Sequence, residues 1–521
     1  MRRNALKIVL GFFLSMTTGS IDLEAARKKT VEERVEKILQ SYRRGEYSKK
    51  KTWVYLNSLS KKRNIQSKTR SRIKAAQAQL LYNDNYPILA SMYSSESIYL
   101  SRNPLARDNT TAWKILRRSS KKQPIEFIMD KLALKYMSLN KSPKFFNKDW
   151  NYVVASALVN KGKNTLAKEY FSKLKMNDRY YLPSQYQIAM INIEKGLFED
   201  AEARLKTILN DVPQEVSPLK EGDIKNLVHY THMALARMYY EQGKFILSAY
   251  HYRRIPKDSP QFYESLFEQS WAFFMAGKPR YALGSLYGAH TPYFKDQYNP
   301  ESKILESIVY FWMCRYDEAR NSLADFATQH SEAVGGLKSF LERQRLTPET
   351  TYILFENLIS GVSASSLGIS TDVLKTAAER DAMKLIRDQY ASVLEELDSL
   401  EQRGVFRSKK GSKVLKSRLE ELALNLQKEL GTIFLTELRS MNEHFEGLYT
   451  QAQFLYLELL MGQKEHLLGR ELHADNKAQR TGKIKKIRDW GKTTQSWKDE
   501  KYEYWWDEVG YQIVDVQPLC N

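Results

Sequence analysis

Few residue patterns in this chain of 521 residues could perform chemistry. His229 and His232 are three positions apart in a stretch with helical spacing, which would place both imidazoles on one face, where they could bind a metal ion. No third ligand follows nearby, so we interpret them as a structural pair. The sequence also lacks the phosphate loop GxxxxGK followed by Ser or Thr, the zinc motif HExxH and the nucleophile motif GxSxG. We therefore expect no catalytic residue, no cofactor and no metal site.

The two cysteines, Cys314 and Cys520, are 206 positions apart. Two cysteines are too few for a disulfide framework or for a four-cysteine zinc site. Whether they pair stays open at this stage, because their separation along the chain does not fix their distance in the fold. Their small number suits an exported protein, in which free thiols are not needed.

The middle of the chain, residues 148–328, repeats a pattern of two helices. One copy spans 182–213 and another spans 229–260, and turn glycines recur 34 positions apart, as between Gly162 and Gly196. Small residues let the two helices approach closely, glycine permits a left-handed cap, and proline stops the second helix. The residues that carry the repeat are Ala189, Gly196, Phe198, Ala201, Pro213, Ala236, Tyr239, Gly243, Phe245, Pro260, Gly277, Ala282, Tyr316 and Ala319.

This repeat resembles the tetratricopeptide repeat (TPR) family. The resemblance implies an α-solenoid whose stacked helix pairs bury one another's apolar faces and leave a concave groove for a protein partner. Gln185, His232 and Leu266 stand where the family has an aromatic residue. The 47-residue step from Gly196 to Gly243 is longer than one repeat, which predicts an insertion between the two copies.

Glu264 is followed by Ser265 in a basic chain with a helical superhelix. In this the protein resembles the lytic transglycosylases, exported enzymes that cleave cell-wall glycan with a glutamate that precedes a serine. Such catalysis needs a carboxylic acid in an apolar cleft with its pKa raised. The glycine-rich motifs of those enzymes do not follow Glu264, so a wall-cleaving enzyme is an alternative and not our main interpretation.

The C-terminal third follows a different spacing. Apolar residues from Met383 to Leu400 alternate in steps of three and four, and a second stripe of this kind begins at Leu415. A basic loop, residues 404–411, separates the two stripes. We predict a helical region over 329–480 that contains a long, coiled-coil-like hairpin; a dimerisation element is the alternative.

Residues 481–521 form an aromatic-rich tail that holds four of the nine tryptophans. Such a tail could fold back as a cap, dock a partner through aromatic hot spots, or stack on a sugar. The candidate docking residues are Trp490, Trp497, Trp505, Trp506 and Tyr511. The ending from Glu503 to Tyr511 resembles exported TPR proteins of the envelope and gliding-motility systems of myxobacteria and predatory bacteria. This resemblance implies a component of an envelope complex.

Positive charge gathers near one end of the chain. The formal net charge is +20, and residues 1–150 hold 32 basic and 12 acidic residues, so the rest of the chain is neutral. A basic surface attracts anionic partners such as an envelope polymer, acidic lipid or nucleic acid, although a solvated face without a partner explains it equally well. The clusters are Lys49–Lys51, Lys61–Arg63, Arg117–Arg118 and Lys121–Lys122.

The first 25 residues have the order of an export signal. A basic start precedes a short apolar run, Ile8–Leu14, and small and polar residues follow. This run is too short to span a membrane, and no other run approaches the roughly 20 residues that a spanning helix needs. We expect cleavage after Ser20 or Ala25 and a periplasmic or otherwise exported protein.

These patterns together predict an all-α protein with a leader (1–25), basic diverged helical repeats (31–147), TPR-like repeats (148–328), the hairpin region and the tail. Its expected function is a non-enzymatic scaffold that joins proteins in a bacterial cell-envelope complex, linked to motility or to the wall. One alternative is a basic helical-repeat protein that retains its leader and binds nucleic acid. The other is the wall-cleaving enzyme.

Overall fold

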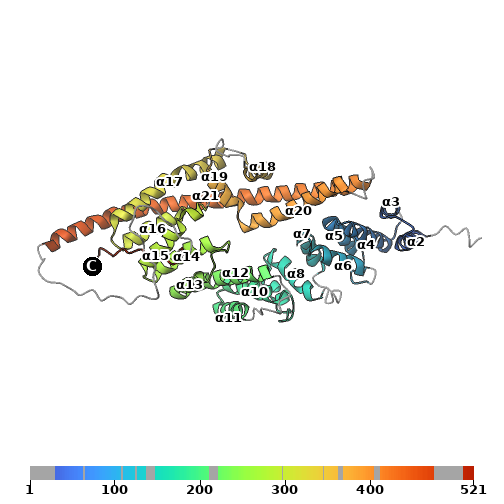
Figure 1. Ribbon diagram of the computed structural model, residues 1–521, viewed down its shortest axis with the longest axis horizontal. Coiled ribbons are helices and arrows are strands. Elements are labelled where there is room, and N and C mark those ends of the chain that lie inside the picture. Colours follow the sequence, from blue (N-terminus) through green and yellow to red (C-terminus); the bar gives the residue numbers. More distant parts are fainter. Residues whose placement is uncertain are drawn as a thin grey trace, which may run out of the picture. The chain divides into compact units, whose positions relative to one another are not determined.

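The computed structural model describes most of the chain, and the regular elements of the described residues are helices (Figure 1). The all-helical class predicted from the sequence is therefore confirmed. No helix in this part of the chain is both long and apolar enough to cross a membrane. The predicted leader, Pro213 and the four tail tryptophans lie outside the described residues. The residues that the structure describes are 30–62, 65–101, 103–106, 109–123, 126–136, 147–210, 221–295, 297–343, 345–361, 368–403, 411–474 and 509–520.

The chain divides into two compact units, each built from two separate stretches of sequence. The first unit comprises Met1–Asn147 and Ala391–Ala423, and the second comprises Lys148–Tyr390 and Leu424–Asn521. The helices of the first unit before residue 137 are α2 (Val31–Arg43), α3 (Lys49–Ser60), α4 (Ser67–Asn83), α5 (Pro87–Leu100), α6 (Thr110–Ser119) and α7 (Glu126–Tyr136).

The second unit begins with short helices that alternate along the chain. These are α8 (Asn147–Val159), α9 (Asn164–Phe171), α10 (Tyr181–Glu194), α11 (Phe198–Asn210), α12 (Glu221–Glu241), α13 (Phe245–Tyr252), α14 (Phe262–Met275), α15 (Pro279–Ala289) and α16 (Glu301–Trp312), with a short 3-10 turn, η2 (Pro292–Phe294). The later helices are α17 (Tyr316–Arg343), α18 (Pro348–Ile359), α19 (Thr371–Ala378), α20 (Asp381–Arg403) and α21 (Gly411–Ala474). α20 and α21 contribute residues to both units.

One turn geometry recurs between the helices of a pair. The turn residue has a left-handed backbone, with φ of 68° at Gly162, 71° at Gly196, 72° at Gly243 and 69° at Gly277. The following amide then donates to a carbonyl five residues earlier, as Leu197 does to Asn192 at 2.8 Å. This cap favours glycine, because a Cβ crowds the backbone at positive φ.

Cys314 occupies the same position in the turn between α16 and α17. Its φ is 55°, and the Arg315 amide donates to the Tyr310 carbonyl at 2.9 Å, which repeats the bond seen at the glycine turns. A residue with a side chain costs roughly 1–2 kcal/mol in this conformation. The turn itself therefore gives no reason for a cysteine.

The small residues of the repeat lie where the helices of a pair meet. Those with no exposed surface are Ala189, Ala201, Ala236, Ala282 and Ala319. Tyr239 is buried, Phe198, Phe245 and Tyr316 are half-buried, and Pro260 is exposed. A larger side chain at the alanine positions would separate the helices, because protein interiors are close-packed.

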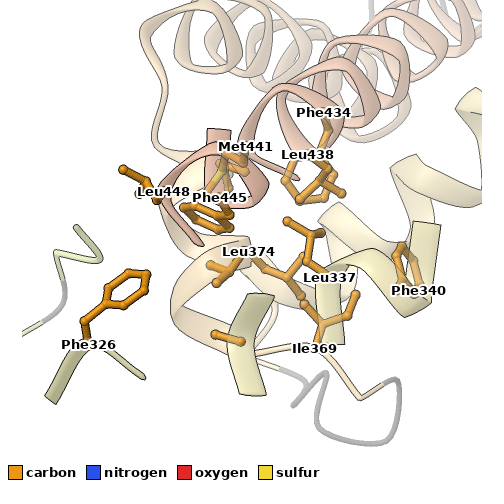
Figure 2. Packing of buried hydrophobic residues seen from close by; sticks show 14 of the residues in the cluster. Phe326, Leu337, Phe340, Ile369, Leu374, Phe434, Leu438, Met441, Phe445 and Leu448 are labelled. Atoms are coloured by element: carbon orange, nitrogen blue, oxygen red, sulfur yellow. The ribbon is translucent and has the colours of Figure 1, made fainter. Parts of the chain in front are cut away.

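α21 contributes a row of apolar side chains to a core that it shares with α17, α18 and α19 (Figure 2). The approach is close at Gly431, where an added Cβ would lie 1.8 Å from the Pro348 carbonyl oxygen. It is also close at Gly462, where a Cβ would lie 3.0 Å from the rings of Phe311 and Tyr316. Only glycine allows a helix to approach its neighbours this closely.

The predicted apolar stripes of the C-terminal third fall on α20 and α21. Their fully or nearly buried members are Met383, Val393, Leu400, Leu415, Leu419, Leu426 and Leu430. The two helices contact each other in both units, through a 2.6 Å ion pair between Lys416 and Glu401 and a 2.7 Å hydrogen bond from Gln427 to Tyr390. The loop that would close the hairpin, 404–410, lies outside the described residues.

In the first unit, α20 supplies the cap of a helix that lies about 300 residues earlier in the chain. The residue before α5, Tyr86, makes no side-chain cap. Instead the buried carboxylate of Glu396 accepts the amide protons of Ile88 at 2.8 Å and of Leu89 at 2.7 Å. These amides have no partner within their own helix, so the late helix completes the early one.

Candidate functional site

The chain places an extended peptide against its own helices. Residues Val509–Cys520, here called the C-terminal strap, lie along α15 and reach the turn after α16; Figure 1 marks the C-terminus near these helices. Val509 is fully buried against Phe262, Leu266 and Ala289. Further along, Val514 and Val516 pack on the apolar cluster of α13–α16. The strap is therefore held at several points along its length.

Two glycines on α15 make room for the strap. An added Cβ at Gly284 would lie 1.9 Å from the Gln512 carbonyl oxygen, and one at Gly288 would lie 3.3 Å from the Gly510 nitrogen. Glycine inside a helix lowers its stability by roughly 1 kcal/mol relative to alanine. Gly284 and Gly288 are one helical turn apart, so their missing side chains open one face of α15 to the main chain of the strap.

Most polar contacts to the strap involve its main chain. The Arg280 guanidinium donates to the Val514 carbonyl at 3.1 Å, and the Arg280 carbonyl accepts from the Val514 amide at 3.2 Å. Arg315 donates to the Gln517 carbonyl at 2.9 Å. A side-chain ion pair, Arg280 to Asp515 at 2.6 Å, is added to these. The main-chain bonds recognise the backbone of the strap, whereas the apolar cluster recognises its valine side chains.

A disulfide between Cys314 and Cys520 closes the end of the strap, with 5.4 Å between the two Cα atoms. Close by, the Leu519 amide donates to the Met313 carbonyl at 2.9 Å. The question of pairing that the sequence left open is thus answered by the structure. It also explains why a cysteine stands at a turn position that favours glycine: Cys314 anchors the strap.

Tyr511 is the one candidate docking residue in the described part of the tail. The residue is 49% exposed, and the cations of Arg253 and Lys257 lie 5.3 Å and 5.5 Å from the centre of its ring. Such contacts contribute about 0.5–1 kcal/mol at exposed sites. Tyr511 therefore contacts the end of α13, with half of its surface left for solvent or a partner.

Glu264 lies in a charged network on α12 and α14. Its carboxylate accepts a 2.8 Å bond from Arg237, which also binds Glu268 at 2.6 Å. Tyr252 donates to Glu268 at 2.6 Å. Burial raises the pKa of Glu264, while the Arg237 guanidinium opposes this by favouring the charged form. In this arrangement Glu264 is an ion-pair partner of Arg237.

His232, one of the two histidines of the predicted structural pair, contacts a histidine of the following helix. His232 Nδ1 lies 3.0 Å from Nδ1 of His251 on α13. Two imidazoles at this distance share one proton as a hydrogen bond, so at least one is neutral. Burial lowers the pKa of both His232 and His251 to about 4. In the described part of the chain, no three His, Cys, Asp or Glu side chains converge as metal ligands would.

The basic clusters of the first unit are partly engaged. Lys49 forms an ion pair with Asp84, Lys122 donates to Asn85 at 2.9 Å, and the Lys51 ammonium lies 4.2 Å from the centre of the Tyr47 ring. The exposed residues of the clusters are Lys50, Lys51, Lys61, Lys62, Arg118, Lys121 and Lys122. The described positive charge is therefore largely on the surface.

An apolar hollow of about 550 Å³ lies between α17 and α21. Its lining includes Leu323, Phe326, Tyr449 and Leu457. Further along α21, the side chain of Met461 is 60% exposed. Apolar surface of this kind is typical of contacts with other proteins.

Three residues that contact the strap depart from the local preferences of their positions. Gly284 and Gly288 interrupt a good helix, and Cys314 replaces the turn glycine of its repeat. Each of these breaks a local preference, and the strap accounts for all of them. No family model matches this chain, and no curated protein matches it closely enough to count as a relative.

Proposed function

We propose that this protein is an exported, non-enzymatic scaffold that holds partner proteins together in a bacterial cell-envelope complex. In this proposal the helix pairs of residues 148–328 are TPR units and α20 and α21 form a hairpin. Residues 1–25 are a leader that is cleaved on export. The partners bind along the repeat surface, and the basic first unit faces an anionic envelope polymer or lipid.

The observation that carries the proposal is the disulfide that fastens an extended segment to the helical repeats. Disulfides persist in oxidising compartments and are rare in the cytosol, so the pair Cys314–Cys520 supports export. The strap also provides one example, within the chain, of the binding mode that the scaffold would use for its partners.

The charged network around Glu264 favours the scaffold over the wall-cleaving enzyme. A general acid must hold its proton until the substrate takes it. Burial raises the pKa of Glu264, as a general acid requires, but its carboxylate also accepts a 2.8 Å hydrogen bond from the Arg237 guanidinium, which favours the charged form. In the scaffold proposal this pair links α12 to α14 and has no chemical role.

The test is cross-linking of the native protein in its own cells, followed by mass spectrometry of the captured partners. Thiols are blocked during lysis, before any reduction, so that a disulfide present in the cell stays distinguishable from one formed later. We expect envelope proteins as partners, a chain that starts near Ile21 or Ala26, and Cys314 linked to Cys520.

The matched control is the variant Glu264→Gln, which should capture the same partners at the same level. An intact leader, blocked thiols and nucleic acid or cytosolic proteins in the cross-linked material would overturn the proposal. Loss of wall-cleaving activity in Glu264→Gln would establish the enzyme in its place.

A further inference from the structure

We propose that the face of α15, together with the turn after α16, is an exchangeable binding site for an extended peptide. The strap fills this site as an internal ligand, and the Cys314–Cys520 disulfide controls whether it can leave. This inference rests on the proposed function, because it names the kind of segment that the scaffold binds and how that binding is regulated.

The site recognises a peptide through its main chain. The Arg280 side chain and carbonyl together contact both main-chain groups of Val514, and Arg315 contacts the Gln517 carbonyl. The missing side chains at Gly284 and Gly288 admit the backbone of the peptide. None of these contacts depends on the strap belonging to the same chain. A segment of another protein with the same backbone conformation would make the same bonds.

The side chains of the strap define the chemistry of the ligand. Val514 and Val516 are two positions apart and both pack on the helices, whereas Asp515 between them pairs with Arg280. The Val516 amide donates to the Val514 carbonyl at 3.0 Å, so the strap makes a tight turn at Asp515 while both valines pack on the helices. The expected ligand is therefore a peptide in which two branched apolar residues flank an acidic residue at such a turn.

The disulfide lies where a reagent can reach it. Cys520 is exposed and Cys314 is half-buried. A thiolate of a dithiol reductant can attack Cys520 Sγ, forming a mixed disulfide and releasing Cys314 as a thiolate that takes up a proton. The second thiol of the reductant then displaces Cys520 as its thiol. Both cysteines are reduced, and the reductant leaves as a disulfide.

Opening the disulfide changes the strap from a locked ligand into a competing one. The strap then stays near the site because it belongs to the same chain and keeps the contacts described above. A ligand within the same chain competes at an effective concentration that the connection between ligand and site sets. A partner peptide displaces the strap when the ratio of its concentration to its Kd exceeds the ratio of the strap's effective concentration to the strap's own Kd.

The test uses the full chain with the strap weakened by Val514→Asp, Val516→Asp and Cys520→Ser, which leaves Cys314 as the single cysteine. The probe is a fluorescein-labelled synthetic peptide of residues 508–521, offered in a glutathione redox buffer. Capture of the probe by Cys314 is followed on non-reducing gels. We expect capture at least tenfold faster than that of a control peptide carrying Asp at both valine positions.

A site variant provides the second comparison. Adding Gly284→Leu to the full chain places a side chain where the peptide backbone must lie. The helix itself gains from the change, so the fold should persist, as circular dichroism will show. We expect the advantage of the valine peptide to disappear. Equal capture of the two peptides, or capture unaffected by Gly284→Leu, would overturn the inference.

The wild-type chain has an intact strap, so it provides a comparison that does not depend on the strap substitutions. Without reduction it should not capture the probe, and after reduction and reoxidation with excess probe it should. Probe captured by the wild-type chain before reduction would also contradict the inference. Failure here leaves the scaffold proposal standing if cross-linking in cells still recovers envelope partners. Selective capture without any envelope partner would instead reject the scaffold proposal alone.

Discussion

At the scale of single residues, Cys314 departs from the local backbone preference of its position. It has a left-handed backbone in a turn whose counterparts in other pairs are glycines. The disulfide offsets the free-energy cost of this backbone conformation, because a disulfide typically stabilises the folded state by about 2–4 kcal/mol through chain entropy. The two effects can be separated, because one cysteine has the strained backbone and the other lies in the strap.

We predict that Cys314→Gly and Cys520→Ser both lose the disulfide but differ in stability. Cys314→Gly also relieves the left-handed strain, so it should be more stable than Cys520→Ser by about 1 kcal/mol. Urea unfolding of both variants, with the wild-type chain in dithiothreitol as the reference, measures the difference. Equal midpoints would show that the turn imposes no strain on Cys314.

Buried histidines make the second unit sensitive to acid. Burial lowers the pKa of His232, His251, His290 and His330 to about 4, below the unfolded value of 6.5. Between these values the unfolded chain binds more protons than the folded one. The stability of this unit should therefore fall as pH drops from 6.5 to 4, by on the order of 1 kcal/mol per histidine.

Thermal unfolding monitored at pH 7, 5.5 and 4.5 tests this dependence. The control is His290→Asn, which keeps a polar side chain beside Ser302 but cannot gain the proton. Its melting temperature should decrease less steeply with acid than that of the wild-type chain. Parallel pH profiles would show that His290 does not contribute.

At the scale of elements, glycines mark where one backbone must approach another. Gly335 and Gly336 are neighbours in α17 with different surroundings: a Cβ at Gly335 would meet nothing within 4 Å, whereas one at Gly336 would lie 2.2 Å from the Gly368 carbonyl oxygen. The same substitution at the two positions therefore separates helix propensity from packing.

We predict that Gly335→Ala stabilises the chain by up to about 1 kcal/mol through helix propensity. Gly336→Ala should destabilise it by roughly 1–3 kcal/mol, because the loop before α19 must move away. Chemical denaturation of both variants gives the comparison. If both variants are more stable than the wild-type chain, the Gly368 carbonyl does not lie as close to Gly336 as the structure places it.

The sequence predicted the elements better than the contacts between distant segments. Repeated glycines and alanines such as Gly196 and Ala201 indicated paired helices, because their signal is local and recurs. The strap gave no such signal, since it is one short segment recognised by residues more than 200 positions earlier. Glu396 likewise looks like an ordinary helical glutamate in sequence, and only the fold shows that it caps α5.

At the scale of the whole molecule, the two units should respond to acid in opposite directions. Burial raises the pKa of Glu396 in the first unit to about 7, with the amide bonds from α5 opposing the shift. The unfolded value is 4.5, so the folded state binds more protons between pH 4.5 and 7. The contribution of Glu396 is then complete below pH 4.5 and is lost as the pH rises through 7.

We predict that lowering the pH from 7.5 to 5 raises the unfolding temperature of the first unit while it lowers that of the second. Differential scanning calorimetry should resolve this as two transitions that move apart or cross. In Glu396→Gln, the first transition should lose most of its pH dependence, since an amide does not titrate in this range. A first transition that keeps its full dependence in this variant would show that other groups control it.

The disulfide has a mechanical consequence for the whole chain. It joins two residues 206 positions apart, so α17–α21 all lie inside one covalent ring. A force applied between the two ends passes directly from Cys314 to Cys520. The chain inside the ring, about 700 Å long when fully extended, therefore carries none of this force. While the bond stays closed, tension between the two ends of the chain could unravel the early helix pairs but could not stretch out the long helix α21.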